Sequence, residues 1–180
     1  MIARRKVFPC FFGSALKLEG VQEFLDGIRK YACVPESPED FGARVFKIMR
    51  DETGKRLTFL KVTGGSLPVK TVFPELEEKA DQIRIYSGDR YETVDEAKAG
   101  MVCAVTGLTK TVPGMGLGTQ KGKIVPVLEP VLTYRLILPE EVDAAVMLKK
   151  LRLLEEEEPE LHVGWNEKTK DILIKVMGEV

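Results

Sequence analysis

The spacing of apolar residues at the start of the chain predicts one strand followed by one helix. Residues 7–12 form a short apolar run, rich in aromatic side chains, that ends at Gly13 and is typical of a buried strand. In residues 20–31 apolar side chains recur at every third or fourth position, which places them on one face of a helix. A strand, a loop and an amphipathic helix are therefore expected to open the chain.

The pattern changes after this helix. Pro35 and Pro38 stand among acidic and serine residues, and they predict a linker with a boundary near residues 35–40. Beyond the linker, helical periods are absent and short apolar runs alternate with clusters of Gly, Asp, Lys and Pro. The predicted strands are 41–50, 57–62, 69–73, 82–86, 101–106 and 124–128. Such a series favours a small closed barrel, because closure removes the unpaired edges of the sheet.

Two segments of this region are rich in turn-forming residues. Residues 51–54 predict a hairpin turn, in which Gly54 adopts the positive φ that closes such loops. The glycine-rich segment 114–123 lacks the spacing of a phosphate-binding loop or of a dinucleotide fingerprint, and a strand rather than a helix is expected after it. We expect it to be a flexible loop of the barrel.

The last fifty residues change character again. Residues 131–138 alternate as a strand, Pro139 and two acids predict the start of a helix, and Pro159 prevents its extension. Residues 161–165 and 172–177 predict a hairpin. This β-α-β-β order is most of a split βαβ sandwich, whose remaining helix and strand would follow, so the sequence is expected to be an excerpt. The apolar face of the helix comprises Ala144, Met147, Leu148, Leu151 and Leu154.

Charge is unevenly distributed along the 180 residues, although the net charge is only -1. Residues 41–130 hold fourteen basic against eleven acidic residues, whereas residues 131–180 hold seven against eleven. So small a positive excess does not establish nucleic-acid binding. Four acids at residues 155–158 indicate a solvated helix end or the contact of a basic partner. No apolar run approaches the roughly 20 residues of a membrane span, so neither membrane insertion nor secretion is expected.

Cysteine usage excludes some chemistry. Cys10, Cys33 and Cys103 are far apart and His162 is the single histidine, which supports neither a disulfide framework nor a zinc site and fits the reducing cytoplasm. Cys10 and Cys103 are expected in the core. A thiol enzyme, in which Cys10 or Cys103 meets His162 as a base, stays open as an alternative.

Residues 12–17, which read Phe-Gly-Ser-Ala-Leu-Lys, stand between the predicted strand and helix. In this order they resemble the fifth nucleotide box of translation-factor GTPases, whose loop closes over the guanine base. Residues 41–48, 60–67 and 104–108 are similar to the second-domain barrel of elongation factor G and its relatives. Residues 153–159 and 177–179 are similar to the third domain. The resemblance to this family spans nearly the whole chain.

The resemblance implies a mixed fold. A small all-β barrel of the translation-protein type, residues 38–130, would follow a short α/β remnant of a GTPase domain, residues 1–37. A partial ferredoxin-like βαββ unit, residues 131–180, would complete it.

The intact relative would bind GTP and magnesium, with Ser14, Ala15 and Leu16 at the guanine base. The phosphate loop, both switch boxes and the Asn-Lys-x-Asp box do not appear in this sequence. Because phosphoryl transfer depends on those parts, this chain alone is expected to be catalytically inert, without a metal or cofactor of its own.

The resemblance also implies that the barrel contacts small-subunit rRNA of the ribosome, whereas neither DNA nor a membrane is expected as a partner. Basic residues of the first predicted hairpin are the candidate contacts, because cations pair with phosphates. They are Arg44, Lys47, Arg50, Lys55, Arg56 and Lys61. Neutralising Lys55 and Arg56 is expected to weaken ribosome binding without altering the fold.

Within the family, residues 154–159 and 177–180 resemble tetracycline ribosomal-protection proteins more closely than housekeeping elongation factor G. The resemblance therefore implies a parent that confers antibiotic resistance. An alternative from another class is a free-standing β-barrel module that binds a protein or a small ligand.

Overall fold

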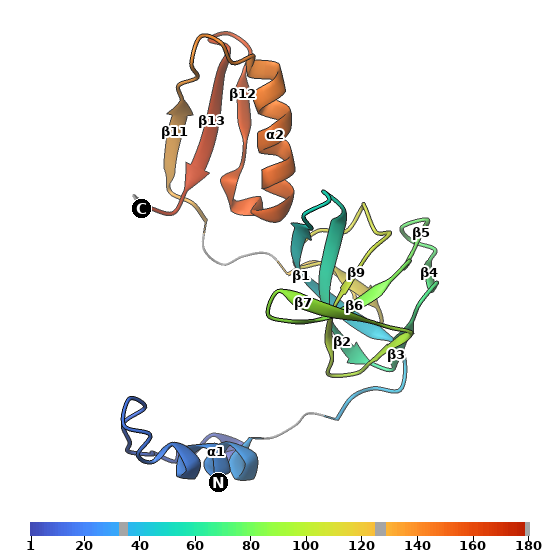
Figure 1. The fold of residues 1–180 in the computed structure, drawn as a ribbon, viewed down its shortest axis with the longest axis vertical. Helices are drawn as coiled ribbons and strands as arrows, with labels where there is room; N and C mark the ends of the chain where they lie inside the picture. Colours follow the sequence, from blue (N-terminus) through green and yellow to red (C-terminus); the bar gives the residue numbers. More distant parts are fainter. Residues whose placement is uncertain (33–35, 125–128, 179–180) are drawn as a thin grey trace. The chain divides into compact units, whose positions relative to one another are not determined.

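The computed structural model describes residues 1–32, 36–124 and 129–178. The chain divides into two compact units, Met1–Glu36 and Ser37–Val180. Figure 1 labels their helices and strands.

The first unit contains the 3-10 helix η1 (Ile2–Arg4) and the helix α1 (Val21–Tyr31). α1 confirms the predicted amphipathic helix. It packs on the preceding segment through Phe11, whose ring meets that of Phe24 edge-on, with the centroids 5.8 Å apart. Gly27 is buried beneath the same ring, and a Cβ at this position would lie 2.1 Å from Cζ of Phe11. Only glycine therefore lets the ring lie this close to the helix.

The predicted strand at residues 7–12 is wrong. Pairing in this part of the described chain is limited to an isolated bridge between Ser14 and Glu19. An apolar run becomes a strand where a neighbouring strand shares its backbone hydrogen bonds, and the described residues of the first unit offer no such neighbour. Phe8 and Phe12 are instead 72% and 92% exposed.

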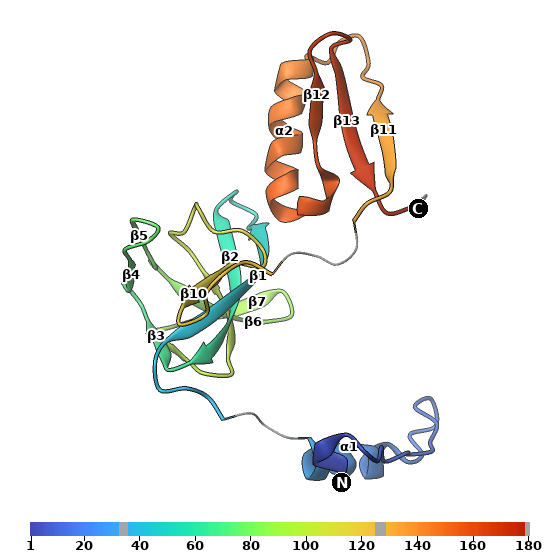
Figure 2. The ribbon, with the colours of Figure 1, turned by 180° about the vertical axis from the view of Figure 1, so that it is seen from behind.

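The second unit begins with a curled, antiparallel sheet of six strands in the order β10-β1-β2-β9-β6-β7. Its strands are β1 (Gly42–Arg50), β2 (Arg56–Gly64), β6 (Ile83–Ser87), β7 (Arg90–Val94), β9 (Val102–Val105) and β10 (Gly116–Gly118). Two small sheets accompany it, β3 (Ser66–Pro68) with β8 (Glu96–Lys98) and β4 (Val72–Phe73) with β5 (Glu78–Lys79). Figure 2 shows β10 beside β1. The predicted β-barrel is confirmed.

The barrel core is formed by side chains that alternate inward along the strands. Val45, Leu60, Ile83 and Val105 of the large sheet are fully buried, and Leu67 of β3 joins them. Each such side chain contributes about 1.5–3 kcal/mol through removal of apolar surface from water.

A β-bulge interrupts the alternation in β1. The register of β1 against β2 shifts between Val45 and Lys47, so that Phe46 and Lys47 are both exposed. Inward packing resumes at Ile48, which is fully buried.

Two expectations for the barrel need correction. Residues 69–73 are not one strand, because Lys70 takes a φ of 65° in the turn between β3 and β4. The glycine-rich segment 114–123 is not an open loop, because β10 pairs with β1 and Met115 bridges Lys123. Of the predicted strand 124–128, Ile124 lies outside any strand and residues 125–128 lie outside the described residues.

The end of the chain forms a βαββ unit. It comprises β11 (Leu132–Leu136), α2 (Ala144–Glu157), the 3-10 helix η2 (Pro159–Leu161), β12 (Gly164–Asn166) and β13 (Asp171–Val176). The sheet order β11-β13-β12 is antiparallel and places the last strand in the centre. This arrangement is the expected part of a ferredoxin-like fold.

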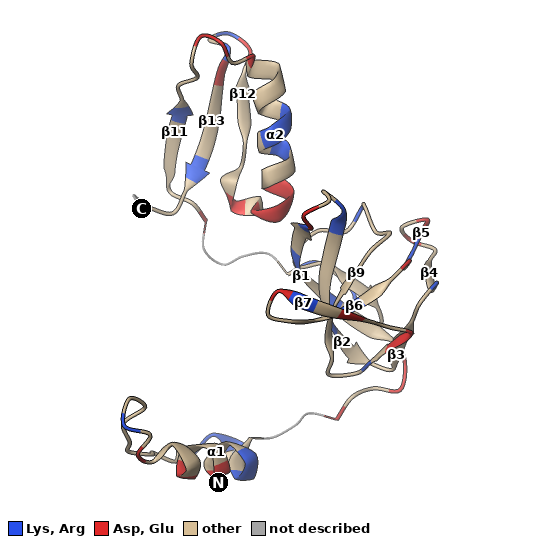
Figure 3. Ribbon diagram, viewed as in Figure 1, with Lys and Arg blue, Asp and Glu red and all other residues tan. Residues whose placement is uncertain are grey.

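The start of α2 differs from the prediction. Pro139 lies in a turn, where its carbonyl accepts the Val142 amide at 3.0 Å. The helix begins after Asp143, whose carboxylate caps it by accepting the Val146 amide at 2.9 Å. A side-chain acceptor at the cap satisfies an amide that the helix leaves unpaired, so it determines the start more strongly than a nearby proline. Figure 3 shows the acidic residues that gather at the other end of α2.

Candidate functional site

The loop at residues 14–19 is a tight turn that precedes α1. Ser14 and Glu19 exchange backbone hydrogen bonds of 2.9 and 3.1 Å. The amides of Ala15 and Leu16 donate no hydrogen bond to any described residue, and Leu16 is 96% exposed. The tip of the loop therefore presents two backbone donors to an incoming group.

A cavity of about 290 Å³ lies beside this loop, within the first unit. The rings of Phe11, Phe12 and Phe24 line it, together with Ser14 and Ala15. Aromatic walls can pack against a flat heterocycle, and the backbone can supply directional polar contacts. Of the three residues predicted to contact the guanine base, Ser14 and Ala15 line this cavity, whereas Leu16 lies outside its lining.

The turn between β1 and β2 is held by Asp51. Its Oδ1 accepts the Thr53 hydroxyl at 2.6 Å and the Lys55 amide at 2.9 Å, while Oδ2 pairs with Arg84 at 3.1 Å. The Thr53 hydroxyl, followed by the Lys55 amide and Arg84, outweighs partial burial and lowers the pKa of Asp51 to about 2. Gly54 closes the turn with a φ of 78°, which confirms the predicted hairpin.

Arg44, a predicted RNA contact, is bound to the glycine-rich segment. Its Nη1 donates to the carbonyls of Gly114 and Gly122 at 3.0 Å each, and Nη2 donates to Oε1 of Gln120 at 2.9 Å. The guanidinium thus supplies the backbone of that segment with partners and helps to hold β10 against β1.

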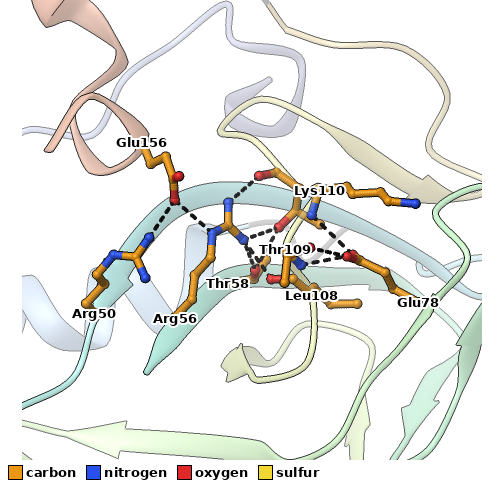
Figure 4. Close-up of polar contacts among 9 residues, drawn as sticks. Arg50, Arg56, Thr58, Glu78, Leu108, Thr109, Lys110 and Glu156 are labelled. Atoms are coloured by element: carbon orange, nitrogen blue, oxygen red, sulfur yellow. Dashed lines mark hydrogen bonds and ion pairs between the residues drawn. The ribbon is translucent and has the colours of Figure 1, made fainter. Parts of the chain in front are cut away.

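Arg56 is the centre of a second polar network (Figure 4). Its side chain is 11% exposed and donates to the carbonyl of Leu108 at 2.7 Å and to the carbonyl of Thr111 at 2.6 Å. Glu156 of α2 pairs with Arg56 at 3.2 Å and with Arg50 at 2.9 Å. Three of the six candidate RNA contacts, all arginines, therefore already have partners within the chain.

The three candidate lysines have a different environment. Lys47 stands at the bulge of β1, Lys55 at the hairpin turn and Lys61 on the outer side of β2. All three are exposed, and their ammonium groups make no hydrogen bond or ion pair with the residues that the structure describes. They are the members of the predicted set that remain available to an external phosphate.

The sequence analysis missed a row of rings on the outer face of the barrel. We define the aromatic row as Phe46, Phe59, Tyr86 and Tyr91, which come from β1, β2, β6 and β7. Successive ring centroids are 6.3, 5.5 and 5.3 Å apart. Alternation with inward residues is a signal that each ring points outward, but only the order of the strands brings the rings together.

The thiol chemistry considered for Cys103 is not supported. Cys103 lies in the barrel core as expected, and burial raises the pKa of its thiol to about 12, so the reactive thiolate is scarce near neutral pH. Cys10, in contrast to the expectation, is exposed, as is His162. Cys33 lies outside the described residues.

Within residues 1–32, 36–124 and 129–178, no group of three or more His, Cys, Asp or Glu side chains is arranged to hold a metal ion. No helix there has the length and apolar character needed to span a membrane.

Comparisons with known proteins connect this geometry to translation factors. Residues 40–116 match the family model described as elongation factor G domain 2. Elongation factor G 2 of Syntrophus aciditrophicus (strain SB) is 28% identical over 204 aligned residues, which cover 97% of this chain and 30% of that protein. These likenesses support the elongation factor family, and this chain spans about 30% of the length of that curated relative.

A crystal structure of a protein from Thermus thermophilus has a similar fold. It matches with a TM-score of 0.69 at 23% sequence identity, over 89% of this chain and 26% of that one. At this identity the likeness concerns the fold alone, and it agrees with a barrel of the translation-protein type.

Proposed function

We propose that the chain acts as part of a ribosome-binding translational GTPase. Residues 1–37 end the GTPase domain, residues 38–130 form the second-domain barrel and residues 131–180 begin the third domain. The match of residues 40–116 to elongation factor G domain 2 is the observation that carries this proposal. The large exposed apolar side chains of the first unit, such as Phe12 and Leu16, add support, because such surface is usually covered by further protein.

In this role the chain contributes binding and not hydrolysis. Ser14, Ala15 and Leu16 close over the base, and GTP with magnesium, held mainly by other parts of the parent, supplies the change of state that switches ribosome affinity. The barrel contacts small-subunit rRNA through Lys47, Lys55 and Lys61, whose ammonium groups are exposed.

The finer assignment within the family rests on the sequence. Residues 154–159 and 177–180 support a parent of the tetracycline ribosomal-protection type, in which ribosome binding serves drug release. The first test concerns ribosome binding, which both subfamilies share.

Neutralising the three exposed lysines tests the RNA contact. The 180-residue chain and its Lys47→Gln/Lys55→Gln/Lys61→Gln variant are mixed with purified bacterial small ribosomal subunits, and binding is measured by co-sedimentation at increasing potassium chloride. If each lysine meets one phosphate, the variant binds more weakly. The negative slope of log affinity against log salt then becomes shallower by about 2.

The matched control, Lys79→Gln/Lys98→Gln/Lys121→Gln, removes the same charge from exposed positions outside the hairpin. It should bind more tightly than the hairpin variant. An equal loss of affinity in both variants would mean that the lysines act only through non-specific electrostatic attraction. No loss of affinity in either variant would refute the RNA contact. GTP turnover by the purified chain would contradict the proposal that this chain contributes binding and not hydrolysis.

A further inference from the structure

The aromatic row depends on one small residue. In the strand order β2-β9-β6, β9 separates Phe59 from Tyr86. Ala104 of β9 pairs with Phe59 on one side and with Arg84 on the other, so it shares their outer face, and yet it is fully buried. Because its side chain ends at Cβ, the two rings can approach across it to a centroid distance of 5.5 Å.

A groove of about 600 Å³ is lined by three rings of this row, Phe59, Tyr86 and Tyr91, and Phe46 lies outside it. Residues of the β1–β2 turn and of the β6–β7 turn complete its lining. We call this feature the aromatic groove. It is large enough to take one long side chain with part of its backbone.

Among the charged residues that line the aromatic groove, those without an ion-pair partner in the described chain are acidic. Of the charged residues that line it, Asp51 pairs with Arg84 and Arg50 pairs with Glu156. Glu52 and Asp89 remain, one on each turn, and neither forms an ion pair with a described residue. Two unpaired carboxylates attract a cation and repel a phosphate.

The ring faces provide a second reason to expect a cation. The guanidinium of Arg84 already lies over the ring of Tyr91, with Cζ 4.3 Å from the centroid. Tyr91 is still 49% exposed. The face of an electron-rich ring favours guanidinium and ammonium groups over neutral ones, so the row and the carboxylates select the same kind of ligand.

We propose that the aromatic groove docks a basic peptide segment of a protein partner, with an arginine or lysine side chain on the rings between Glu52 and Asp89. None of the three lysines assigned to RNA lines the aromatic groove, and Lys55 stands in the same β1–β2 turn as Glu52. The inference also holds if the chain has no role in translation.

The test uses the 180-residue chain and a fluorescein-labelled synthetic peptide of four Arg-Gly repeats. Binding is measured by fluorescence anisotropy at low and at high salt, and circular dichroism confirms that each variant is folded. The Glu52→Gln/Asp89→Asn variant is expected to bind about five-fold more weakly, since two exposed charge pairs are lost. Tyr91→Ala is expected to lose about three-fold, whereas Tyr91→Phe keeps the ring and the affinity.

The control variant Glu75→Gln/Glu96→Gln removes two exposed carboxylates that do not line the aromatic groove. It should bind the peptide like the unmodified chain. A labelled octamer of uridylate tests the alternative that the aromatic groove binds single-stranded RNA. Failure of the peptide to bind, equal loss in both double variants, or uridylate binding that depends on Tyr91 would each overturn the proposal.

Discussion

Two adjacent residues of the first barrel hairpin illustrate how differently similar charges are used. Arg56 donates to backbone carbonyls of Leu108 and Thr111 from a largely buried position, whereas the ammonium of Lys55 is exposed in the turn. Neutralising both together, as the sequence suggested, would therefore mix a structural effect with a surface effect. The two positions need to be separated.

Arg56→Ala should lower the free energy of unfolding by about 2–3 kcal/mol, because buried carbonyls lose charged donors. Lys55→Ala should change it by less than about 0.5 kcal/mol. Urea denaturation followed by circular dichroism measures both. Equal values for the two variants would contradict the assignment of Arg56 to the barrel framework.

Asp51 makes the stability of the hairpin dependent on acid. Its pKa falls from 3.8 to about 2 on folding, so the stability that its carboxylate adds is fully present above pH 3.8 and is lost as the pH drops toward 2. The difference in unfolding free energy between the unmodified chain and Asp51→Asn should therefore be constant near neutral pH and shrink across that acid window. A difference that grows on acidification would show that folding does not lower the pKa of Asp51.

At the scale of elements, the backbone between β9 and the following segment depends on a glycine. Gly107 has a φ of 94°, and a Cβ there would lie 2.5 Å from the carbonyl oxygen of Lys79. Gly54 has a similar φ of 78° but no atom within 4 Å of the corresponding position. Alanine at Gly54 would therefore cause backbone strain alone, whereas alanine at Gly107 would cause the same strain and a steric collision.

Gly54→Ala should cost about 1–2 kcal/mol, the penalty of a left-handed alanine. Gly107→Ala should cost at least about 3 kcal/mol, because a carbonyl of the β5 hairpin must also move. Thermal and urea unfolding of the two variants gives the comparison. Indistinguishable losses would mean that the approach to Lys79 relaxes without cost.

At the scale of the whole molecule, the two compact units differ in how much they bury. Among the described residues of α1 only Gly27 is buried, whereas β2 and β9 hold several fully buried side chains such as Leu60 and Val105. Local opening is easiest where few apolar contacts are lost. The stability of the chain is therefore not uniform.

Hydrogen exchange measured by mass spectrometry should show this difference. Amides of α1 are expected to exchange at least about a hundred-fold faster than those of β2 and β9, a factor that corresponds to about 2.7 kcal/mol of opening free energy. Protection of α1 equal to that of the barrel strands would show that the first unit is held by more than its own contacts.

The sequence by itself determined the features that depend on neighbours along the chain. The periodicity of residues 20–31 predicts α1, the turn at 51–54 predicts the first hairpin, and clusters of turn-forming residues between short apolar runs predict separate short strands. These features are local, since side-chain spacing and a residue's allowed φ are set within a few positions.

The tertiary structure decided everything that requires a distant partner. Residues 7–12 form no strand because the described part of the first unit offers no strand to pair with, although their apolar pattern permits one. Arg44 and Arg56 serve the framework because carbonyls more than fifty positions away reach them. The aromatic row exists because the sheet places β9, which carries the small Ala104, between the strands that carry Phe59 and Tyr86. Strand order is set by the packing of the whole barrel, and no local pattern of side chains encodes it.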